Sequence, residues 1–209
     1  MSERLRPQIS SRKQPKQARS NDLIAAVLDA AVQVLRTEGA SRFTTARVAE
    51  RAGVSVGSLY QYFPNKASIL FRLQSDEWRR TSAMLRDILV DTKRPPKERL
   101  RSMTHAFLRS ECEEAEVRTA LGDAAPLYRD APEAEAARAS GAFIFRDFVG
   151  EALPGVDASS VALASDLIEA TLTQVGSRFS EAERTSQEIA EYADAMADMF
   201  CAYLAGLAK

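Results

Sequence analysis

The sequence holds few of the residues on which metal sites and disulfide-bonded domains depend. Its 209 residues include two cysteines and one histidine. Cys112 and Cys201 lie far apart and lack the spacing of metal ligands, so neither a zinc site nor a disulfide framework is expected. We therefore predict no metal and no cofactor, in a chain that works in a reducing cytosol.

Motifs of catalysis are absent as well. The sequence contains no nucleophile elbow and no glycine-rich phosphate loop. His105 and Cys112 are seven residues apart, and two turns of one helix separate such a pair too far for a direct hydrogen bond. We expect no catalytic residue and a protein that is not an enzyme.

Long apolar runs are also missing. No stretch reaches 18 consecutive apolar residues, and the polar N-terminus lacks the apolar centre of a secretion signal. These absences predict a cytoplasmic protein without a membrane partner. The chain also has no useful alternating strand pattern and no internal repeat, so the fold class is expected to be all-α.

Charge is distributed unevenly along the chain. Residues 1–72 hold 12 Lys and Arg against 5 Asp and Glu, whereas residues 73–209 hold 16 against 24. A basic N-terminal third is suited to contact with a polyanion, and the acidic remainder should face away from it. A solvated basic tail on an acidic domain is the alternative, but it leaves the motif described next unexplained.

Residues 44–66 read as two short helical patterns separated by a tight turn at Gly53. Either Thr44 or Thr45 can cap the first helix, and Ser55 is placed to cap the second. A glycine is favoured at the turn because the chain leaves a helix there with positive φ. Small and hydroxylated residues would face outward from the second helix, as required of a helix that enters the major groove of DNA.

This region resembles the DNA-binding segment of the TetR family of bacterial transcriptional regulators. The resemblance runs from about Asn21 to Leu73 and is strongest at LYQYFPNK, residues 59–66. It implies an all-α protein with an N-terminal three-helix helix-turn-helix DNA-binding domain and a C-terminal helical ligand-binding and dimerisation domain. The corresponding expected division is 1–19 as a disordered basic arm, 20–66 as the DNA-binding domain and 67–209 as the second domain.

Family precedent and side-chain chemistry together give the candidate DNA contacts. The family's motif places contacts at Thr45, Ser55, Val56, Gly57, Ser58, Tyr60, Tyr62 and Lys66, and the residues themselves add Thr44, Arg47 and Gln61. Gln61 is the one side chain of the second helix able to make a bidentate contact to adenine. Three alternatives stay open: Tyr60 in the core, Thr44 as a cap only, and Lys66 as a solvated lysine.

Helical periodicity, glycine and proline define the remaining elements. Helices are predicted at 21–37, capped by Ser20 and stopped by Gly39, and at 65–91, 97–112, 115–124, 133–152, 158–180 and 186–207. The resemblance implies a repressor of transcription that a small-molecule effector releases from DNA. Candidate ligand-binding residues in the second domain are Trp78, Met103, Phe107, Tyr128, Phe143, Phe145, Phe148 and Gln174, for each of which ordinary helix packing is the alternative.

The last two predicted helices carry apolar and small residues around much of their circumference, so they need more than one partner surface. In the family such helices form a two-fold bundle, which implies a homodimer bound to a palindromic operator in double-stranded DNA. The expected interface residues are Ile168, Leu172, Val175, Met196, Phe200 and Tyr203. The alternative is a monomer that buries both helices inward.

Overall fold

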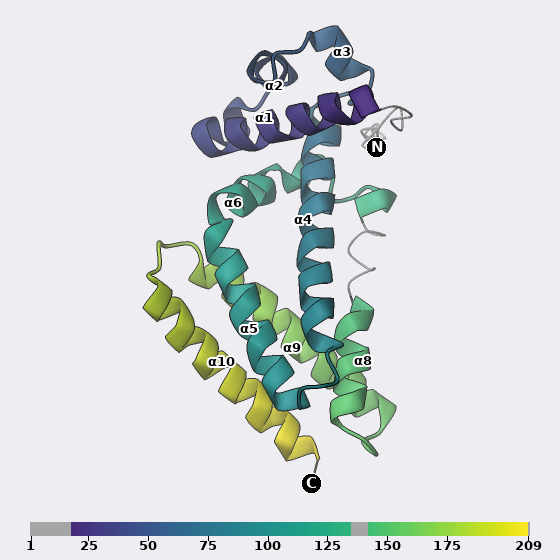
Figure 1. Ribbon diagram of the computed structural model, residues 1–209, viewed down its shortest axis with the longest axis vertical. Helices are drawn as coiled ribbons and strands as arrows, with labels where there is room; N and C mark the ends of the chain where they lie inside the picture. The colour runs from purple at the N-terminus through teal and green to yellow at the C-terminus, as the bar shows by residue number, and fades with distance from the viewer. Residues whose placement is uncertain (1–17, 135–141, 209) are drawn as a thin grey trace, which may run out of the picture. The chain divides into compact units, whose positions relative to one another are not determined.

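A computed structural model describes residues 18–134 and 142–208, and within these ranges the chain forms helices and connecting turns with no strand (Figure 1). The elements are α1 (Ala18–Arg42), α2 (Thr45–Arg51), α3 (Val56–Tyr60), α4 (Lys66–Leu89), α5 (Pro96–Glu113), α6 (Ala115–Ala124), the short 3₁₀ helix η1 (Ala125–Leu127), α8 (Ala142–Ala152), α9 (Ala158–Phe179) and α10 (Ser186–Leu207). The predicted all-α class is confirmed.

The chain divides into two compact units. The N-terminal unit is the described part of Met1–Glu77 with Glu116–Arg138, and the C-terminal unit is that of Trp78–Ala115 with Ala139–Lys209. This division differs from the expected boundary at residue 66, because α6 and η1 pack with the N-terminal helices. The basic arm predicted at 1–19 lies almost entirely outside the described residues.

The core of the N-terminal unit is built by the apolar stripe of α1 and by residues from α2, α3, α4 and α6. Its fully covered side chains include Val27, Val34, Phe43, Val48, Leu59, Phe63, Ile69, Leu70 and Leu121. Gly39 has φ 72° and breaks the regular backbone of α1 near the predicted stop. Ser20 is not the cap that the sequence predicts for this helix, because it lies inside the first turn.

The C-terminal unit is organised around α5, against which α8, α9 and α10 pack. Figure 1 shows α10 lying alongside α5. Gly176 in α9 permits close approach, because a Cβ there would lie 2.8 Å from Cε1 of Phe107. The helices predicted at 97–112, 115–124, 158–180 and 186–207 are confirmed to within a residue or two. The middle of the one predicted at 133–152 lies outside the described residues.

Thr185 is the N-cap of α10 and forms a capping box, in which its hydroxyl accepts from the Glu188 amide and the Glu188 carboxylate accepts from the Thr185 amide. No helix in the described part of the chain is long and apolar enough to cross a membrane.

Candidate DNA interface

Local hydrogen bonds define the helix pair α2 and α3. Thr44, and not Thr45, is the N-cap of α2, and its hydroxyl accepts from the Arg47 amide at 3.3 Å. Ser55 caps α3 and accepts from the Ser58 amide at 3.0 Å. Between the helices Gly53 has φ 66°, a backbone conformation that side-chain-bearing residues adopt only at a cost. The predicted helix-turn-helix is confirmed at the level of its caps and its turn.

One face of this pair is packed and the other is open. Val48 and Ala49 of α2 and Leu59 and Phe63 at α3 are fully buried in the N-terminal core. Because α3 is only one and a half turns long, burial of Leu59 determines which of its residues face outward. A surface for a partner therefore remains on the outer side.

None of the eleven predicted DNA-contact residues is buried. Exposed are Thr44, Arg47, Ser55, Val56, Gly57, Tyr60, Gln61 and Lys66, and partly exposed are Thr45, Ser58 and Tyr62. The open question about Tyr60 is resolved, because its side chain is 40% exposed and does not belong to the core. Its hydroxyl lies 3.1 Å from that of Thr45, which joins α3 to the start of α2.

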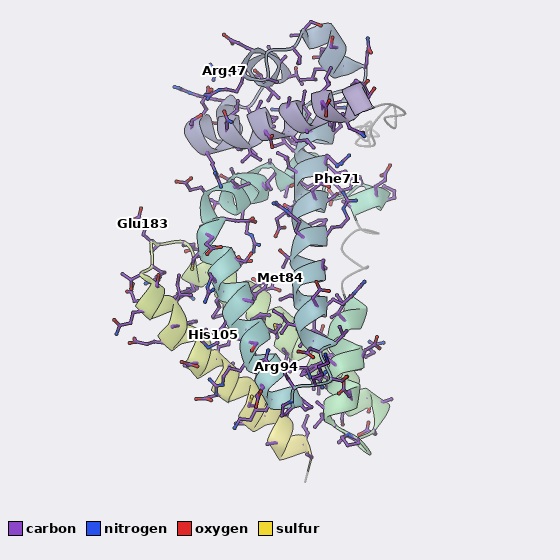
Figure 2. The ribbon with its side chains drawn as sticks, viewed as in Figure 1. Arg47, Phe71, Met84, Arg94, His105 and Glu183 are labelled. Carbon is purple, nitrogen blue, oxygen red and sulfur yellow. The ribbon has the colours of Figure 1, made fainter. Side chains whose placement is uncertain are left out.

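Basic side chains flank this surface. Arg47 forms an ion pair with Glu38 of α1, and Figure 2 marks it on α2. Arg51 donates to Gln33 of α1 at 3.3 Å. Lys66 is exposed in the first turn of α4. Positive side chains at the edge of a groove-reading helix are placed to contact phosphates, which position a protein on DNA without specifying sequence.

Tyr62 makes a contact that the sequence did not predict. Its hydroxyl donates to the Ser20 hydroxyl of α1 at 3.1 Å, and its side chain is half-buried. The only hydroxyl hydrogen of Tyr62 is thus engaged by Ser20. Because 42 residues separate the two, no local pattern could have identified Ser20.

The predicted ligand-binding residues belong to both units of the chain. Met103, Phe107, Phe145 and Phe148 share the core of the C-terminal unit. Trp78 is half-buried in that unit, Gln174 is exposed on α9, and the side chain of Phe143 lies outside the described part. Tyr128 belongs to the core of the N-terminal unit.

Tyr128 instead joins a buried polar group of the N-terminal unit. Its hydroxyl donates to the Leu121 carbonyl at 3.1 Å, and burial followed by the nearby Glu77 carboxylate raises its pKa. Glu77 is 2.8 Å from Arg118 of α6 and accepts from Gln74 at 3.0 Å. These contacts attach α6 to the first half of α4. In the part of the chain that can be described, no group of His, Cys, Asp and Glu could hold a metal ion.

Four of the six predicted dimer-interface residues must be reassigned. Ile168, Leu172, Met196 and Phe200 are at most 5% exposed and form the core of the C-terminal unit. A side chain already covered by its own chain cannot supply the primary contact surface for a second copy, so these four stabilise the protomer. Val175 and Tyr203 are partly exposed.

The apolar residues that α9 and α10 leave open are different ones. Leu163 and Leu167 of α9 are 63% and 47% exposed, and Tyr192 and Met199 of α10 are 39% and 51% exposed. On each helix the two residues lie on one face at helical spacing.

Fold and site together define a helix-turn-helix DNA-binding protein. Residues 27–73 match the family described as bacterial regulatory proteins, tetR family. Residues 95–207, more than half of the chain, match the tetracyclin repressor-like C-terminal domain. The chain belongs to the TetR family and is a DNA-binding transcriptional regulator.

Curated relatives match only part of the chain. It is 39% identical over 84 residues to the nucleoid occlusion factor SlmA of Vibrio campbellii, which covers 39% of this chain and 42% of that protein. It is 52% identical over 42 residues to the same factor of Vibrio atlanticus, covering 20% of this chain and 21% of that protein. The matched segments thus span less than half of these relatives.

Solved structures match at greater length and lower identity. The fatty acid degradation regulator FadR of Bacillus halodurans has a TM-score of 0.68 and 18% identity, with 93% of this chain and 98% of that chain covered. FadR of Bacillus subtilis, solved in complex with stearoyl-CoA, has a TM-score of 0.63 and 17% identity, with 84% and 96% covered. At these identities the comparison concerns the fold.

Proposed function

We propose that this regulator is a homodimeric repressor that binds a palindromic operator and is released from it by a small-molecule effector. The observation that carries the proposal is the outward face of α3, where Val56, Gly57, Tyr60 and Gln61 are all exposed beside the N-terminus of α2. A short helix fixed by buried contacts on one side and open on the other is suited to enter a major groove.

One short helix contacts too few base pairs to specify a genomic site. Two copies related by a two-fold axis read half-sites about 34–36 Å apart, or a multiple of that distance, which makes the operator a palindrome. We assign base contacts to Ser55, Val56, Gly57, Ser58, Tyr60 and Gln61, and phosphate contacts to Thr44, Arg47, Lys66 and the Tyr62–Ser20 pair. A dimer on a promoter represses because it blocks the polymerase without any further contact.

The exposed apolar faces of α9 and α10 support the dimer. Leu163 and Leu167 are continued along α9 by Ala170 and Gln174, and the corresponding exposed face of α10 consists of Tyr192, Ala195, Met199, Ala202 and Gly206. None of these residues is charged, although exposed Asp166 of α9 and Glu188 of α10 lie at helical spacing from Leu163 and Tyr192. Two copies that associate through these residues would form a largely apolar contact.

An effector is proposed to bind the C-terminal unit among Met103, Phe107, Phe145 and Phe148. Grouped aromatic side chains favour an apolar molecule. The stearoyl-CoA of the Bacillus subtilis FadR and the proflavine bound to LfrR of Mycobacterium smegmatis are ligands of proteins with this fold. A ligand that binds better to the DNA-free form must weaken DNA binding by the same factor.

The test is selection of bound sequences from random duplex DNA with the full chain, followed by titration at several salt concentrations. We expect a palindromic consensus and an affinity that falls steeply with salt. Lys66→Ala should weaken binding to all sequences and lower the salt slope by about one per protomer. The exposed Lys93 of the C-terminal unit provides the control, since Lys93→Ala should leave the slope unchanged.

Absence of duplex binding at low salt, or an unchanged slope for Lys66→Ala, would contradict the assignment of the DNA surface. The effector is tested by repeating the titration with apolar small molecules, including a long-chain acyl-CoA. If no compound alters the affinity, the proposal of release by an apolar effector is rejected, while the DNA-binding result stands.

A further inference from the structure

The DNA-facing segment contains no charged side chain. Residues 52–65, which include the turn and all of α3, hold no Lys, Arg, Asp, Glu or His. Guanine is read most strongly by the bidentate donors of Arg or Lys, and the amino group of cytosine by Asp or Glu. The segment therefore lacks the side chains that select a G·C pair most effectively.

The hydroxyl groups on this surface are largely occupied by one another. The Ser55 and Ser58 hydroxyls are 2.8 Å apart, and those of Thr45 and Tyr60 are 3.1 Å apart. Each pair uses one of its two hydrogens internally and keeps one to donate. A single donor fits acceptor atoms of guanine, adenine and thymine alike, so these pairs discriminate weakly among bases.

Two kinds of exposed side chain at α3 can still distinguish one DNA base from another. Val56 and Tyr60 are 39% and 40% exposed and lie four residues apart, so they form one apolar patch on α3. The thymine methyl is the apolar group that a base pair presents in the major groove. Gln61 is exposed beside the patch, and its amide matches the N6 and N7 positions of adenine.

We infer that each half-site is read at A·T pairs, with Val56 against a thymine methyl group and Gln61 on an adenine. This inference rests on the proposed DNA-binding function and adds to it the chemical class of base that α3 selects. Val56 is then a specificity-determining residue, although its side chain can form no hydrogen bond.

Methyl deletion on the DNA tests the role of Val56. In the selected operator, each thymine is replaced in both half-sites by deoxyuridine, which pairs in the same way and lacks only the C5-methyl group. The affinity is measured by fluorescence anisotropy with the full chain. At one position we expect a loss of about fourfold per half-site, the value of one buried methyl group, and hence about fifteenfold for the dimer.

Two matched variants determine whether Val56 makes the contact. Val56→Ala should weaken binding to the thymine operator and reduce the deoxyuridine effect at that position to less than about twofold. Val90 is an exposed valine of the C-terminal unit, and Val90→Ala should retain the full effect. If no thymine is sensitive, or if the sensitivity persists in Val56→Ala, the assignment of Val56 is overturned.

Gln61 is tested independently through the base that it prefers. Since a carboxylate accepts from the cytosine amino group, Gln61→Glu should change the selected base from adenine to cytosine at one position of each half-site. An unchanged consensus would overturn the role of Gln61, and a wild-type consensus of G·C pairs would overturn the inference as a whole. Both outcomes still require duplex binding, so they are distinguishable from failure of the proposed function, which is loss of all such binding.

Discussion

Two glycines four residues apart have different roles in the helix-turn-helix. Gly53 has φ 66° and forms the turn, whereas Gly57 lies in α3 without a positive φ. A Cβ on Gly57 would lie 3.8 Å from the Ser55 Oγ atom, an ordinary van der Waals contact. The fold thus requires glycine at residue 53 but not at residue 57, where the proposed close approach of DNA would account for the missing side chain.

This difference leads to opposite effects of one substitution. Gly53→Ala should lower the free energy of unfolding by about 1–2 kcal/mol, the cost of a left-handed conformation for a residue with a Cβ. Gly57→Ala should raise it by roughly 0.5–1 kcal/mol, because alanine favours a helix interior. If α3 approaches DNA as proposed, Gly57→Ala should nevertheless weaken operator binding by roughly tenfold through overlap with DNA. Urea denaturation and anisotropy measure the two effects, and normal operator affinity in Gly57→Ala would refute the close approach.

Residue-scale features that depend on local geometry could be predicted from the sequence. The turn at Gly53 and the cap at Ser55 follow from φ preferences and from hydroxyl groups next to free amides. The choice of Thr44 over Thr45 and the Ser20–Tyr62 contact could not be predicted. These depend on where a second helix lies, and residues 42 apart have no fixed relation in the sequence.

At the scale of elements, the close packing of α5 and α9 depends on Gly176. A Cβ there would lie 2.8 Å from Phe107 Cε1 and 3.3 Å from Glu111 Cγ. Gly176→Ala should therefore lower stability by about 1–3 kcal/mol despite the higher helix propensity of alanine. A Cβ on Gly122 of α6 would meet no neighbouring side chain within 4 Å, so Gly122→Ala should be neutral or stabilising. Equal thermal midpoints for the two variants would show that α5 and α9 can separate at little cost.

A charged cluster attaches α10 to α5 and predicts a dependence on pH. Asp194 of α10 accepts from His105 at 3.0 Å and from Arg101 at 2.6 Å, and Figure 2 marks His105 on α5. The hydrogen bond from His105, followed by that from Arg101, lowers the pKa of Asp194. A lowered carboxyl pKa contributes stability above the unfolded value of about 3.9, and that contribution is lost as pH falls through the folded value.

Asp194→Asn should therefore be less stable than the wild type at pH 7, and the difference should shrink in acid below about pH 4. Urea midpoints at the two pH values measure this change. Asp87 is exposed on α4, and Asp87→Asn serves as the control with little effect at either pH. A difference between wild type and Asp194→Asn that stays constant with pH would mean that the ion pairs do not stabilise the contact of α10 with α5.

The bounds of the helices could be predicted more reliably than the surfaces against which the helices pack. The ends of α5, α6, α9 and α10 agree with expectation because prolines and capping residues determine them locally. The expected dimer surface was mostly misplaced, since Ile168 and Leu172 are buried while Leu163 and Leu167 are exposed. All four are leucine or isoleucine on one helix, and periodicity cannot distinguish a face covered by the same chain from one left for a second copy.

At the scale of the whole molecule, each of the two units carries its own core, and one continuous helix, α4, runs through both. The domain boundary that we predicted at residue 66 was placed at the end of the DNA-binding motif. It missed the return of residues 116–134 to the N-terminal unit, which depends on long-range contacts such as the ion pair of Arg118 with Glu77. Tyr128, one of the predicted effector residues, belongs to this returning segment.

The proposed dimer leads to the last prediction. Leu167→Glu or Met199→Glu places a carboxylate among the exposed apolar residues of α9 and α10, where a partner would desolvate it. Either variant should be monomeric by light scattering, and its affinity for the palindrome should fall toward that for a single half-site. Leu127 is 37% exposed in the N-terminal unit, and Leu127→Glu should remain dimeric. If both interface variants form dimers of wild-type stability, the two copies must associate through another surface, and the exposed apolar residues of α9 and α10 would need a different explanation.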